Sequence, residues 1–302
     1  MYQNLVLDPE SGTTKLDKSF LELITYQGRE YQNYSVEKKT YFEPVDDDEI
    51  ERLRLQHQIF HKIFGEKWIF PQMGAPELVL DCGCGAGTWA AEVAEEYPDC
   101  KVIGVDISPH MMPDEAPENL YLQVDDLNRE FTFDPNYFDV VNSRFVASGL
   151  NKHRWESYIE DIKTTLKPGG WVQMVEMYFN VQSDNGTITD AHALRKWSSK
   201  YLKSLEDVKE LRVAMKLGGL LEAARFNNVQ TRVINVPLAP WPDDAHLREI
   251  GRINRPNVHL LLESLALYPL VKRMNMSREE FDELVAQART EIDDLSLKAY
   301  FS

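Results

Sequence analysis

A strand, a glycine-rich turn and a helix follow one another between residues 78 and 97, and they constrain the fold most. Leu78, Val79 and Leu80 form a short apolar run typical of a buried parallel strand. Three glycines at alternate positions follow, and then comes the apolar face of a helix that ends before Pro98. Glycines let a ligand approach the backbone closely, and the first N–H groups of a helix point at such a ligand. The segment therefore predicts a ligand-binding turn at the carboxyl end of a parallel strand.

Four further strands are predicted after this turn, with helices between them. Short apolar runs at 101–107, 120–124, 138–142 and 171–177 indicate buried strands, and apolar side chains at helical spacing predict a helix over 155–166. Strands that alternate with helices in this way favour a mostly parallel sheet with helices on both faces. The sequence therefore predicts an α/β fold.

Two flanking regions surround this core, which we place at 71–180. In the N-terminal region, 1–70, three aspartates at 46–48 precede apolar residues at helical spacing, which predicts a capped helix of about four turns. The C-terminal region, 181–302, is mostly helical and contains one strand-like stretch. Its helices are predicted near 191–205, 208–225, 246–267 and 278–297, and its strand at 229–236. We expect the first region to pack over the ligand turn and the second to be a helical substrate cover with one or two sheet-completing strands.

The charge balance and the cysteines exclude several classes of function. The chain has 33 Lys and Arg against 49 Asp and Glu, a net charge of −16, and such a surface repels nucleic-acid backbones. No apolar run approaches the ~20 residues of a membrane span, and no signal peptide is visible. Cys82 and Cys84 are spaced too closely for a mutual disulfide, and no second pair follows at zinc spacing. We therefore expect a reduced protein without metal, in the cytoplasm or also in the nucleus.

Acidic residues follow three successive strands and indicate what the turn binds. Asp81 precedes the glycines, where a carboxylate suits an ammonium or sulfonium and repels a pyrophosphate; Thr88 holds the place of the third glycine of the dinucleotide fingerprint. Asp106 can accept hydrogen bonds from ribose hydroxyls, and Asp126 from an adenine amino group. Because the ends of parallel strands line one crevice, the three acids favour S-adenosylmethionine over NAD. For the glycine turn alone, a tight turn without a ligand stays open as the alternative.

Motifs along the chain together resemble those of class I S-adenosylmethionine-dependent methyltransferases. These are D-C-G-C-G-A-G-T-W, V-I-G-V-D-I-S-P, V-D-D-L-N, F-D-V-V-N-S-R and L-K-P-G-G-W-V-Q. The narrower resemblance, over about residues 26–300, is to the LaeA-like methyltransferases of filamentous fungi. It depends on G-R-E-Y-Q-N-Y (28–34), R-L-x-L-Q-H (52–57), P-L-A-P-W-P (237–242) and S-R-E-E-F (277–281). The resemblance implies a Rossmann-like, seven-stranded type of sheet and S-adenosylmethionine as cofactor.

The resemblance also implies roles for residues at the first two strand ends. Asp81, Gly83 and Gly85 would hold the methionine end of the cofactor. Asp106 would hold the ribose, and Ile107 would lie against the adenine. These roles make the glycine turn the centre of the site.

Further cofactor contacts are implied around the adenine and the sulfonium. Asp126 and the backbone N–H of Leu127 would bind the adenine edge. Ser143 and Arg144, after the fourth strand, would lie by the sulfonium and the amino-acid portion. Tyr34, from the N-terminal region, would close over the site.

For the acceptor, the resemblance implies that Glu176 and Tyr178 face it, at the end of the fifth strand. Methyl transfer from a sulfonium mainly requires placement and exclusion of water, so no catalytic side chain is assigned. We expect a methyltransferase that acts on a small molecule, a fungal secondary metabolite with an O, N or S acceptor. The alternative is a regulatory protein that acts through a partner protein in the control of secondary metabolism or development. A protein methyltransferase for lysine or arginine is a third interpretation.

One departure from the resembled family concerns the end of the chain. In that family a last strand follows the segment that matches residues 298–301, whereas this sequence stops at Ser302. In the class I sheet that strand inserts between two others. We expect that the sequence is trimmed there or that the sheet edge is covered in another way.

Overall fold

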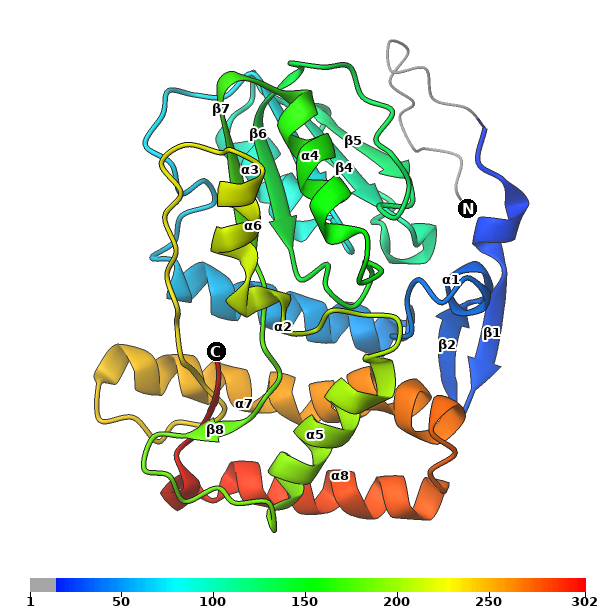
Figure 1. The fold of residues 1–302 in the computed structure, drawn as a ribbon, viewed down its shortest axis with the longest axis vertical. Coiled ribbons are helices and arrows are strands. Elements are labelled where there is room, and N and C mark those ends of the chain that lie inside the picture. Colours follow the sequence, from blue (N-terminus) through cyan, green and yellow to red (C-terminus); the bar gives the residue numbers. More distant parts are fainter. Residues whose placement is uncertain (1–14) are drawn as a thin grey trace.

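Parallel strands form the central sheet of this computed structural model, which describes residues 15–302 (Figure 1). Their bounds are Leu78–Cys82 (β3), Lys101–Asp106 (β4), Leu120–Val124 (β5), Phe138–Arg144 (β6) and Leu166–Val175 (β7). They pair in the order β5-β4-β3-β6-β7. From β3, the chain adds β4 and β5 on one side and then β6 and β7 on the other, so the strand order changes direction between β3 and β6. The carboxyl ends of these two parallel strands therefore flank the crevice where open parallel sheets bind ligands.

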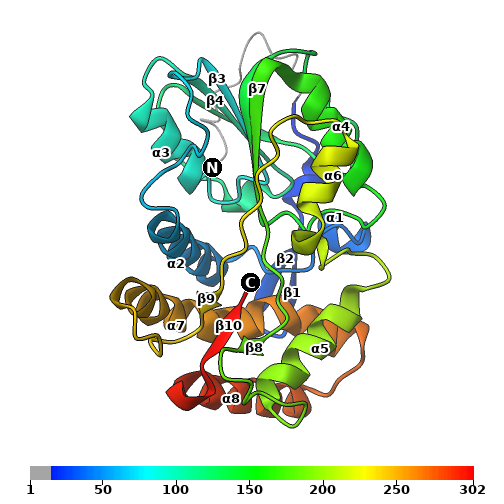
Figure 2. The same ribbon diagram turned by 60° about the vertical axis from the view of Figure 1, so that its left-hand side comes forward.

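Side chains alternate between the two faces of the sheet, and helices cover both faces. Val79 lies in an apolar cluster with α3 (Thr88–Glu96). Leu80, the next residue, lies in a second cluster with α4 (Trp155–Thr165). α6 (Leu217–Ala223) lies beside α4 on that side (Figure 2). Because each strand packs on both faces, its sequence is a continuous apolar run, and the predicted α/β fold is confirmed.

A second layer of helices lies under the carboxyl edge of the sheet (Figure 1). α2 (Asp47–Ile63) is its upper member and packs on α7 (Ala245–Ala266). α5 (Ala193–Leu205) and α8 (Arg278–Asp293) complete the layer below. The carboxylate of Asp46 caps α2, as the acidic run predicted. Three of the four helices predicted for the C-terminal region are present here.

The sheet and its predicted completing strand differ from expectation. Within the described residues the parallel sheet has five strands rather than seven, and the stretch 229–236 does not join it. The strand found there is Val236–Pro237 (β9). It pairs with β10 (Ala299–Phe301), which also pairs with β8 (Gln182–Ser183). A strand needs a partner edge for its backbone groups, and β10 supplies that edge in the helical layer, away from the main sheet (Figure 2).

The predicted helix over 208–225 is also shorter than expected. It consists of a 3₁₀ turn at Val213–Met215 followed by α6. The preceding residues turn irregularly because the buried ammonium of Lys209 donates to the backbone carbonyls of Thr40 and Gly149. A continuous helix would not bring this side chain between those two segments.

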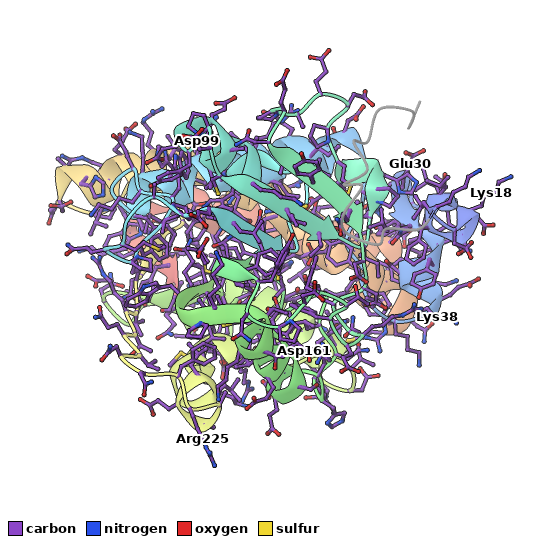
Figure 3. All side chains as sticks on the ribbon, turned by 90° about the horizontal axis from the view of Figure 1, so that it is seen from above. Lys18, Glu30, Lys38, Asp99, Asp161 and Arg225 are labelled. Carbon is purple, nitrogen blue, oxygen red and sulfur yellow. The ribbon has the colours of Figure 1, made fainter. Side chains whose placement is uncertain are left out.

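The remaining elements are short. A 3₁₀ turn, a hairpin and one helical turn lie at one side of the molecule (Figure 1), at Lys18–Leu21, Leu23–Tyr26 (β1), Arg29–Gln32 (β2) and Asn33–Glu37 (α1). Two 3₁₀ turns and a π-helical turn are found at Pro109–Met111, Leu295–Leu297 and Leu267–Arg273. Seen from above, Lys18 and Lys38 mark this side, and Arg225 lies at a distant edge (Figure 3). Among the described helices, none has the length and apolarity that a bilayer crossing requires.

A cofactor and acceptor cavity between the sheet and the lower helices

A cavity lies where the carboxyl ends of β3, β4 and β6 meet α2 and the helical layer. The volume of this cavity is about 170 Å³. Its walls come from the glycine turn, the loops after β4, β5 and β6, the end of β7, and segments of both flanking regions. Nine of the residues predicted for the site line it: Asp81, Gly83, Gly85, Asp106, Ile107, Asp126, Leu127, Arg144 and Glu176.

Glycine is required in the turn between β3 and α3. Gly83 and Gly85 have φ angles of 70° and 53°, in the left-handed region that other residues avoid. A Cβ on Gly83 would stand 2.6 Å from Cγ1 of Val146, inside contact distance. The turn thus brings main-chain groups to the cavity wall where side chains would block them.

Asp106 is fixed at the end of β4 by the glycine turn itself. Its Oδ2 accepts a hydrogen bond from the Gly85 N–H and its Oδ1 accepts one from the Ser108 N–H, both at 2.9 Å. Burial raises the pKa of Asp106, and these backbone donors oppose the rise. Each carboxylate oxygen keeps a further lone pair. The pair can accept two vicinal hydroxyls, as ribose offers.

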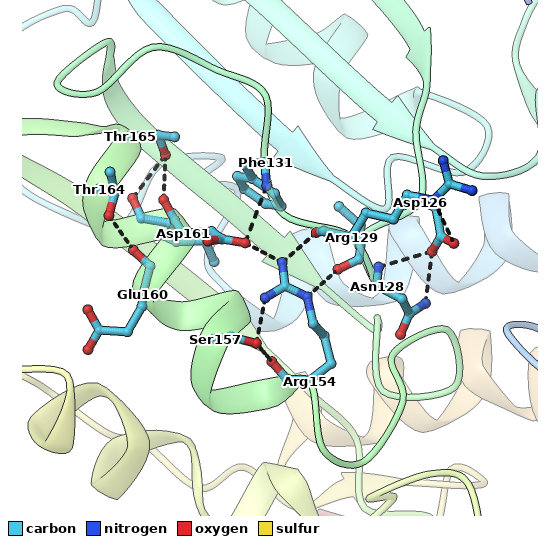
Figure 4. A network of polar contacts seen from close by, with 12 residues as sticks. Asp126, Asn128, Arg129, Phe131, Arg154, Ser157, Glu160, Asp161, Thr164 and Thr165 are labelled. Carbon is cyan, nitrogen blue, oxygen red and sulfur yellow. Dashed lines mark hydrogen bonds and ion pairs between the residues drawn. The ribbon is translucent and has the colours of Figure 1, made fainter.

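The loop after β5 is held in place by Arg154, the residue just before α4 (Figure 4). The guanidinium of Arg154 pairs with Asp161 and donates to the backbone oxygens of Leu127 and Arg129. Oδ1 of Asp126 accepts from the backbone and side chain of Asn128, at 3.0 and 2.9 Å. Oδ2 of Asp126 accepts no such bond within the described chain; the Arg129 Nε is 4.0 Å away. This oxygen remains available to a ligand's amino group.

Asp81 and Arg144 lie on neighbouring strands and carry opposite charges, but they form no ion pair with each other. Asp81 accepts one hydrogen bond, 2.7 Å from Nδ2 of Asn142, and burial raises its pKa to about 7. Burial lowers the pKa of Arg144, whose Nη2 lies 3.2 Å from Nδ1 of His57. Two incompletely paired opposite charges at one end of a cavity fit a zwitterion with an ammonium and a carboxylate. The amino-acid end of S-adenosylmethionine has this pattern, so the residues present fit that cofactor.

Three predicted residues lie away from the cavity wall. Tyr34 stacks on Phe20, with ring centroids 4.3 Å apart, and its hydroxyl accepts from Arg129. Ser143 is fully buried behind the wall, where the Tyr158 hydroxyl donates to it at 2.9 Å. Tyr178 is not among the lining residues; it lies beyond the end of β7, where its backbone N–H donates to the carbonyl oxygen of Ser302 at 2.8 Å.

The side of the cavity near the end of β7, where we expect the acceptor, combines acidic side chains with apolar walls. The Glu176 carboxylate accepts from the backbone N–H groups of Val146 and Ala147, and burial raises its pKa to about 8. Tyr201 has a buried hydroxyl without a hydrogen-bond partner among the described residues. The hydroxyl of Tyr41 donates to Glu43 at 2.8 Å. Apolar side chains complete the lining here: Met177, Phe179, Leu211 and Leu265.

Several polar lining residues were missed from the sequence, among them Tyr41, Glu43, Arg52, His57 and Tyr201. Arg52 and His57 belong to the R-L-x-L-Q-H motif, so that motif was the available signal. Tyr41, Glu43 and Tyr201 had no local signal, because tertiary packing alone brings them to the strand ends.

The fold, the glycine turn and the acids at the strand ends define a class I S-adenosylmethionine-dependent methyltransferase. Residues 79–170 match the family described as "Methyltransferase domain". S-adenosylmethionine is therefore the methyl donor, as the strand-end acids predicted.

The chain belongs to the LaeA-like family of these enzymes. It is 30% identical over 252 residues to the secondary metabolism regulator LAE1 of Cochliobolus heterostrophus, covering 81% of this chain and 80% of that protein. It is 27% identical to the protein-methionine methyltransferase laeA of Emericella nidulans (90% and 72% covered), and 25% identical to the methyltransferase pytC of Aspergillus terreus (98% and 90% covered). A solved structure, phosphoethanolamine N-methyltransferase 2 of Haemonchus contortus, has a TM-score of 0.45 and 21% identity, over 81% of this chain and about half (51%) of its own length.

Proposed function

We propose that this methyltransferase transfers a methyl group to a small molecule, a fungal secondary metabolite with an oxygen, nitrogen or sulfur acceptor. The observation that carries the proposal is the acceptor side of the cavity. The buried side chains of Glu43 and Tyr201 and the half-buried carboxylate of Glu176 lie there among apolar side chains, the composition of a small-molecule site. The resemblance to pytC over nearly the whole chain supports the same class of function.

In this proposal each region of the chain has its own task. Residues 71–180 bind the cofactor, the described part of the N-terminal region (15–70) closes the cavity from one side, and 181–302 supply part of the acceptor pocket. Asp81 and Arg144 bind the amino-acid end, Asp106 the ribose, and the Asp126 loop the adenine. The cofactor, when bound, supplies an electrophilic methyl group on a sulfonium.

The protein's own residues then position the acceptor and remove its proton. Glu176 lies at the end of β7, beside the strand that carries Arg144. Its raised pKa of about 8 makes its carboxylate a stronger base than an exposed glutamate. It accepts the proton from an acceptor hydroxyl or ammonium, whereas a thiolate acceptor needs no such step. The surrounding apolar walls exclude water from the reacting pair.

Cofactor assignment is tested by calorimetric titration with S-adenosylhomocysteine. Replacing Asp106 with Ala removes both acceptors for the ribose hydroxyls, so affinity should fall by more than tenfold. Asp99→Ala, at an exposed surface acid (Figure 3), is the control and should bind as the wild type does. Equal affinity for the Asp106→Ala variant would contradict the ribose assignment.

The acceptor class is tested with a donor that carries an isotope-labelled methyl group. The purified protein is incubated with it and with a fungal metabolite extract, and products are analysed by mass spectrometry. We expect small molecules that gain one labelled methyl, and none with Asp106→Ala. Label found only in protein would overturn the proposal.

That second outcome would favour a regulatory protein that acts through a partner. The 30% identity to a secondary metabolism regulator is the observation for this candidate. Such a protein should present a contiguous apolar patch. In the described part of the chain the large exposed apolar residues come from separate elements, such as Leu23 on β1, Met215 before α6 and Leu295 after α8. This distribution favours the small-molecule enzyme.

A further inference from the structure

We propose that His57 is a positioning residue that holds the guanidinium of Arg144 where it meets the carboxylate of the bound methyl donor. The inference rests on the proposed contact between Arg144 and the amino-acid end of that donor. This inference gives a role to His57, the histidine of the R-L-x-L-Q-H motif, for which the proposed function has no role.

The first observation is the limited partnership of Arg144. Its side chain lies at the end of β6 and lines the cavity. Within residues 15–302 no carboxylate lies within 4.0 Å of its guanidinium, and the hydrogen bond it makes is the 3.2 Å contact with Nδ1 of His57. A half-buried guanidinium with one neutral acceptor has donors left for an anionic ligand group.

The second observation fixes the protonation of His57. A guanidinium only donates, so Nδ1 of His57 must accept, and the ring proton must lie on Nε2. Nε2 faces Oε2 of Glu92 on α3 at 2.8 Å, where that proton is donated. Glu92 therefore orients the imidazole, and the imidazole orients the guanidinium. A protonated imidazole could not accept from Arg144 and would place a like charge against it.

The third observation is that the ring is held from its face as well. His57 stacks on Trp68 with centroids 5.3 Å apart and planes 15° from parallel. The backbone oxygen of Trp68 accepts from Nε1 of Trp89 and from Nε2 of Gln173. The imidazole therefore cannot turn without moving this tryptophan.

The same support reaches the acid on the other strand. Nε2 of Gln173 also donates to Oδ1 of Asn142, whose Nδ2 donates to Asp81. One network thus orients both charged groups. Through Asn142 it orients Asp81 toward the ammonium of the ligand. Through Trp68 and His57 it orients Arg144 toward the ligand's carboxylate. Such a network places both charges before the ligand arrives, which reduces the entropy lost on binding.

The test compares two ligands that differ in the amino-acid end. S-adenosylhomocysteine carries it, whereas 5′-methylthioadenosine lacks it. His57→Phe keeps a ring for stacking on Trp68 but removes the acceptor. We expect it to weaken S-adenosylhomocysteine about tenfold in calorimetry, the effect of one misplaced charged hydrogen bond. Affinity for 5′-methylthioadenosine should change less than twofold.

Two variants separate positioning from a merely structural role. His57→Asn can place an amide oxygen near the position of Nδ1, so it should restore S-adenosylhomocysteine binding to within threefold of wild type. His61→Phe is the matched control, because His61 lies one turn along α2 and also stacks on Trp68, at 3.8 Å. It should alter neither affinity. Glu92→Leu, at a partly exposed position, should weaken S-adenosylhomocysteine selectively even if His57→Phe folds poorly.

The outcomes distinguish a failure of this inference about His57 from a failure of the proposed contact between Arg144 and the amino-acid end of the donor. If Arg144→Met fails to weaken S-adenosylhomocysteine selectively, the Arg144 assignment itself is wrong. If Arg144→Met is selective but His57→Phe and Glu92→Leu are not, His57 is not a positioning residue. Equal weakening of both ligands by His57→Phe would likewise overturn the inference, since it would show general damage to the cavity.

Discussion

At the scale of the residue, the cavity keeps charges that burial disfavours. Asp81 and Arg144 lie on adjacent strands without forming an ion pair. Burial raises the pKa of Asp81 and lowers the pKa of Arg144, and both shifts favour the neutral form of the side chain. Such groups lower the stability of the ligand-free protein and are retained where a ligand completes them. Stability and binding should therefore respond in opposite directions to the same substitution.

Asp81→Asn tests this opposition. In the wild type, the Asp81 carboxyl has a pKa of about 7 when folded and an ordinary value of 3.8 when unfolded. The wild-type free energy of unfolding therefore falls as the pH rises from about 4 to about 7. The amide still accepts from Asn142 but does not ionise. At pH 8 the variant should gain about 2–4 kcal/mol in free energy of unfolding, measured by denaturant titration, and lose S-adenosylhomocysteine affinity. A variant less stable than wild type at pH 8 would contradict this account.

Glu176 predicts a dependence of turnover on pH. Only its ionised form accepts a proton, so with a hydroxyl or ammonium acceptor the wild-type rate should rise about tenfold per pH unit below about 8 and then level. Glu176→Gln should lower the plateau and flatten this rise. Rate profiles of the two proteins from pH 6 to 9 check it. An unchanged profile in the variant would remove Glu176 as proton acceptor.

At the scale of the element, the turn between β3 and α3 combines two constraints at one glycine. Gly83 needs a left-handed backbone and also lacks room for a Cβ beside Val146. Gly169, in the turn inside β7, shares the positive φ, at 83°, but has open space around its Cβ position. The two glycines therefore separate backbone strain from steric exclusion.

Gly83→Ala should be more destabilising than Gly169→Ala. Backbone strain alone costs about 1 kcal/mol in either position, and the clash with Val146 adds about 1–3 kcal/mol at Gly83. Chemical denaturation of both variants measures the difference. Equal losses would show that Val146 moves aside freely.

At the scale of the whole molecule, buried polar side chains join segments that lie far apart in the sequence. Arg52 on α2 pairs with Glu49 and donates to Asn257 on α7 at 3.4 Å. Lys209 donates to backbone oxygens of Thr40 and Gly149, one from the N-terminal region and one from the core. These links hold the cavity closed from below.

Lys209→Met should loosen this closure. It leaves the buried carbonyl oxygen of Thr40 without its donor, whereas the Gly149 oxygen still accepts from Nδ2 of Asn128, and the loss costs about 1–3 kcal/mol in free energy of unfolding. Lys216→Met, which removes only a half-exposed ion pair with Glu210, is the control and should change stability by less than about 1 kcal/mol. Faster amide hydrogen exchange around Thr40 and Gly149 should accompany the loss in the Lys209 variant alone. Equal stability of the two variants would show that Lys209 does not hold these segments together.

The sequence by itself determined the sheet and the cofactor edge. Apolar runs, glycines and acids for β3, β4 and β5 lie within about fifty consecutive residues, 78–126, and parallel pairing brings their ends together. Local patterns were weaker where an extended stretch had a choice of partners. Residues 229–236 resemble a strand, yet β10 rather than the main sheet pairs with their end.

Only the tertiary structure decided how the cavity is closed and which groups face the acceptor. Arg52 and Asn257, which meet in the helical layer, are 205 residues apart in the chain, and the cavity draws Glu43, Glu176 and Tyr201 from three separate regions. No periodicity in one segment encodes such a meeting, because it depends on how two amphipathic faces pack. The relay from Glu92 through His57 to Arg144 has the same origin: its three members come from α3, α2 and β6, and packing alone aligns them.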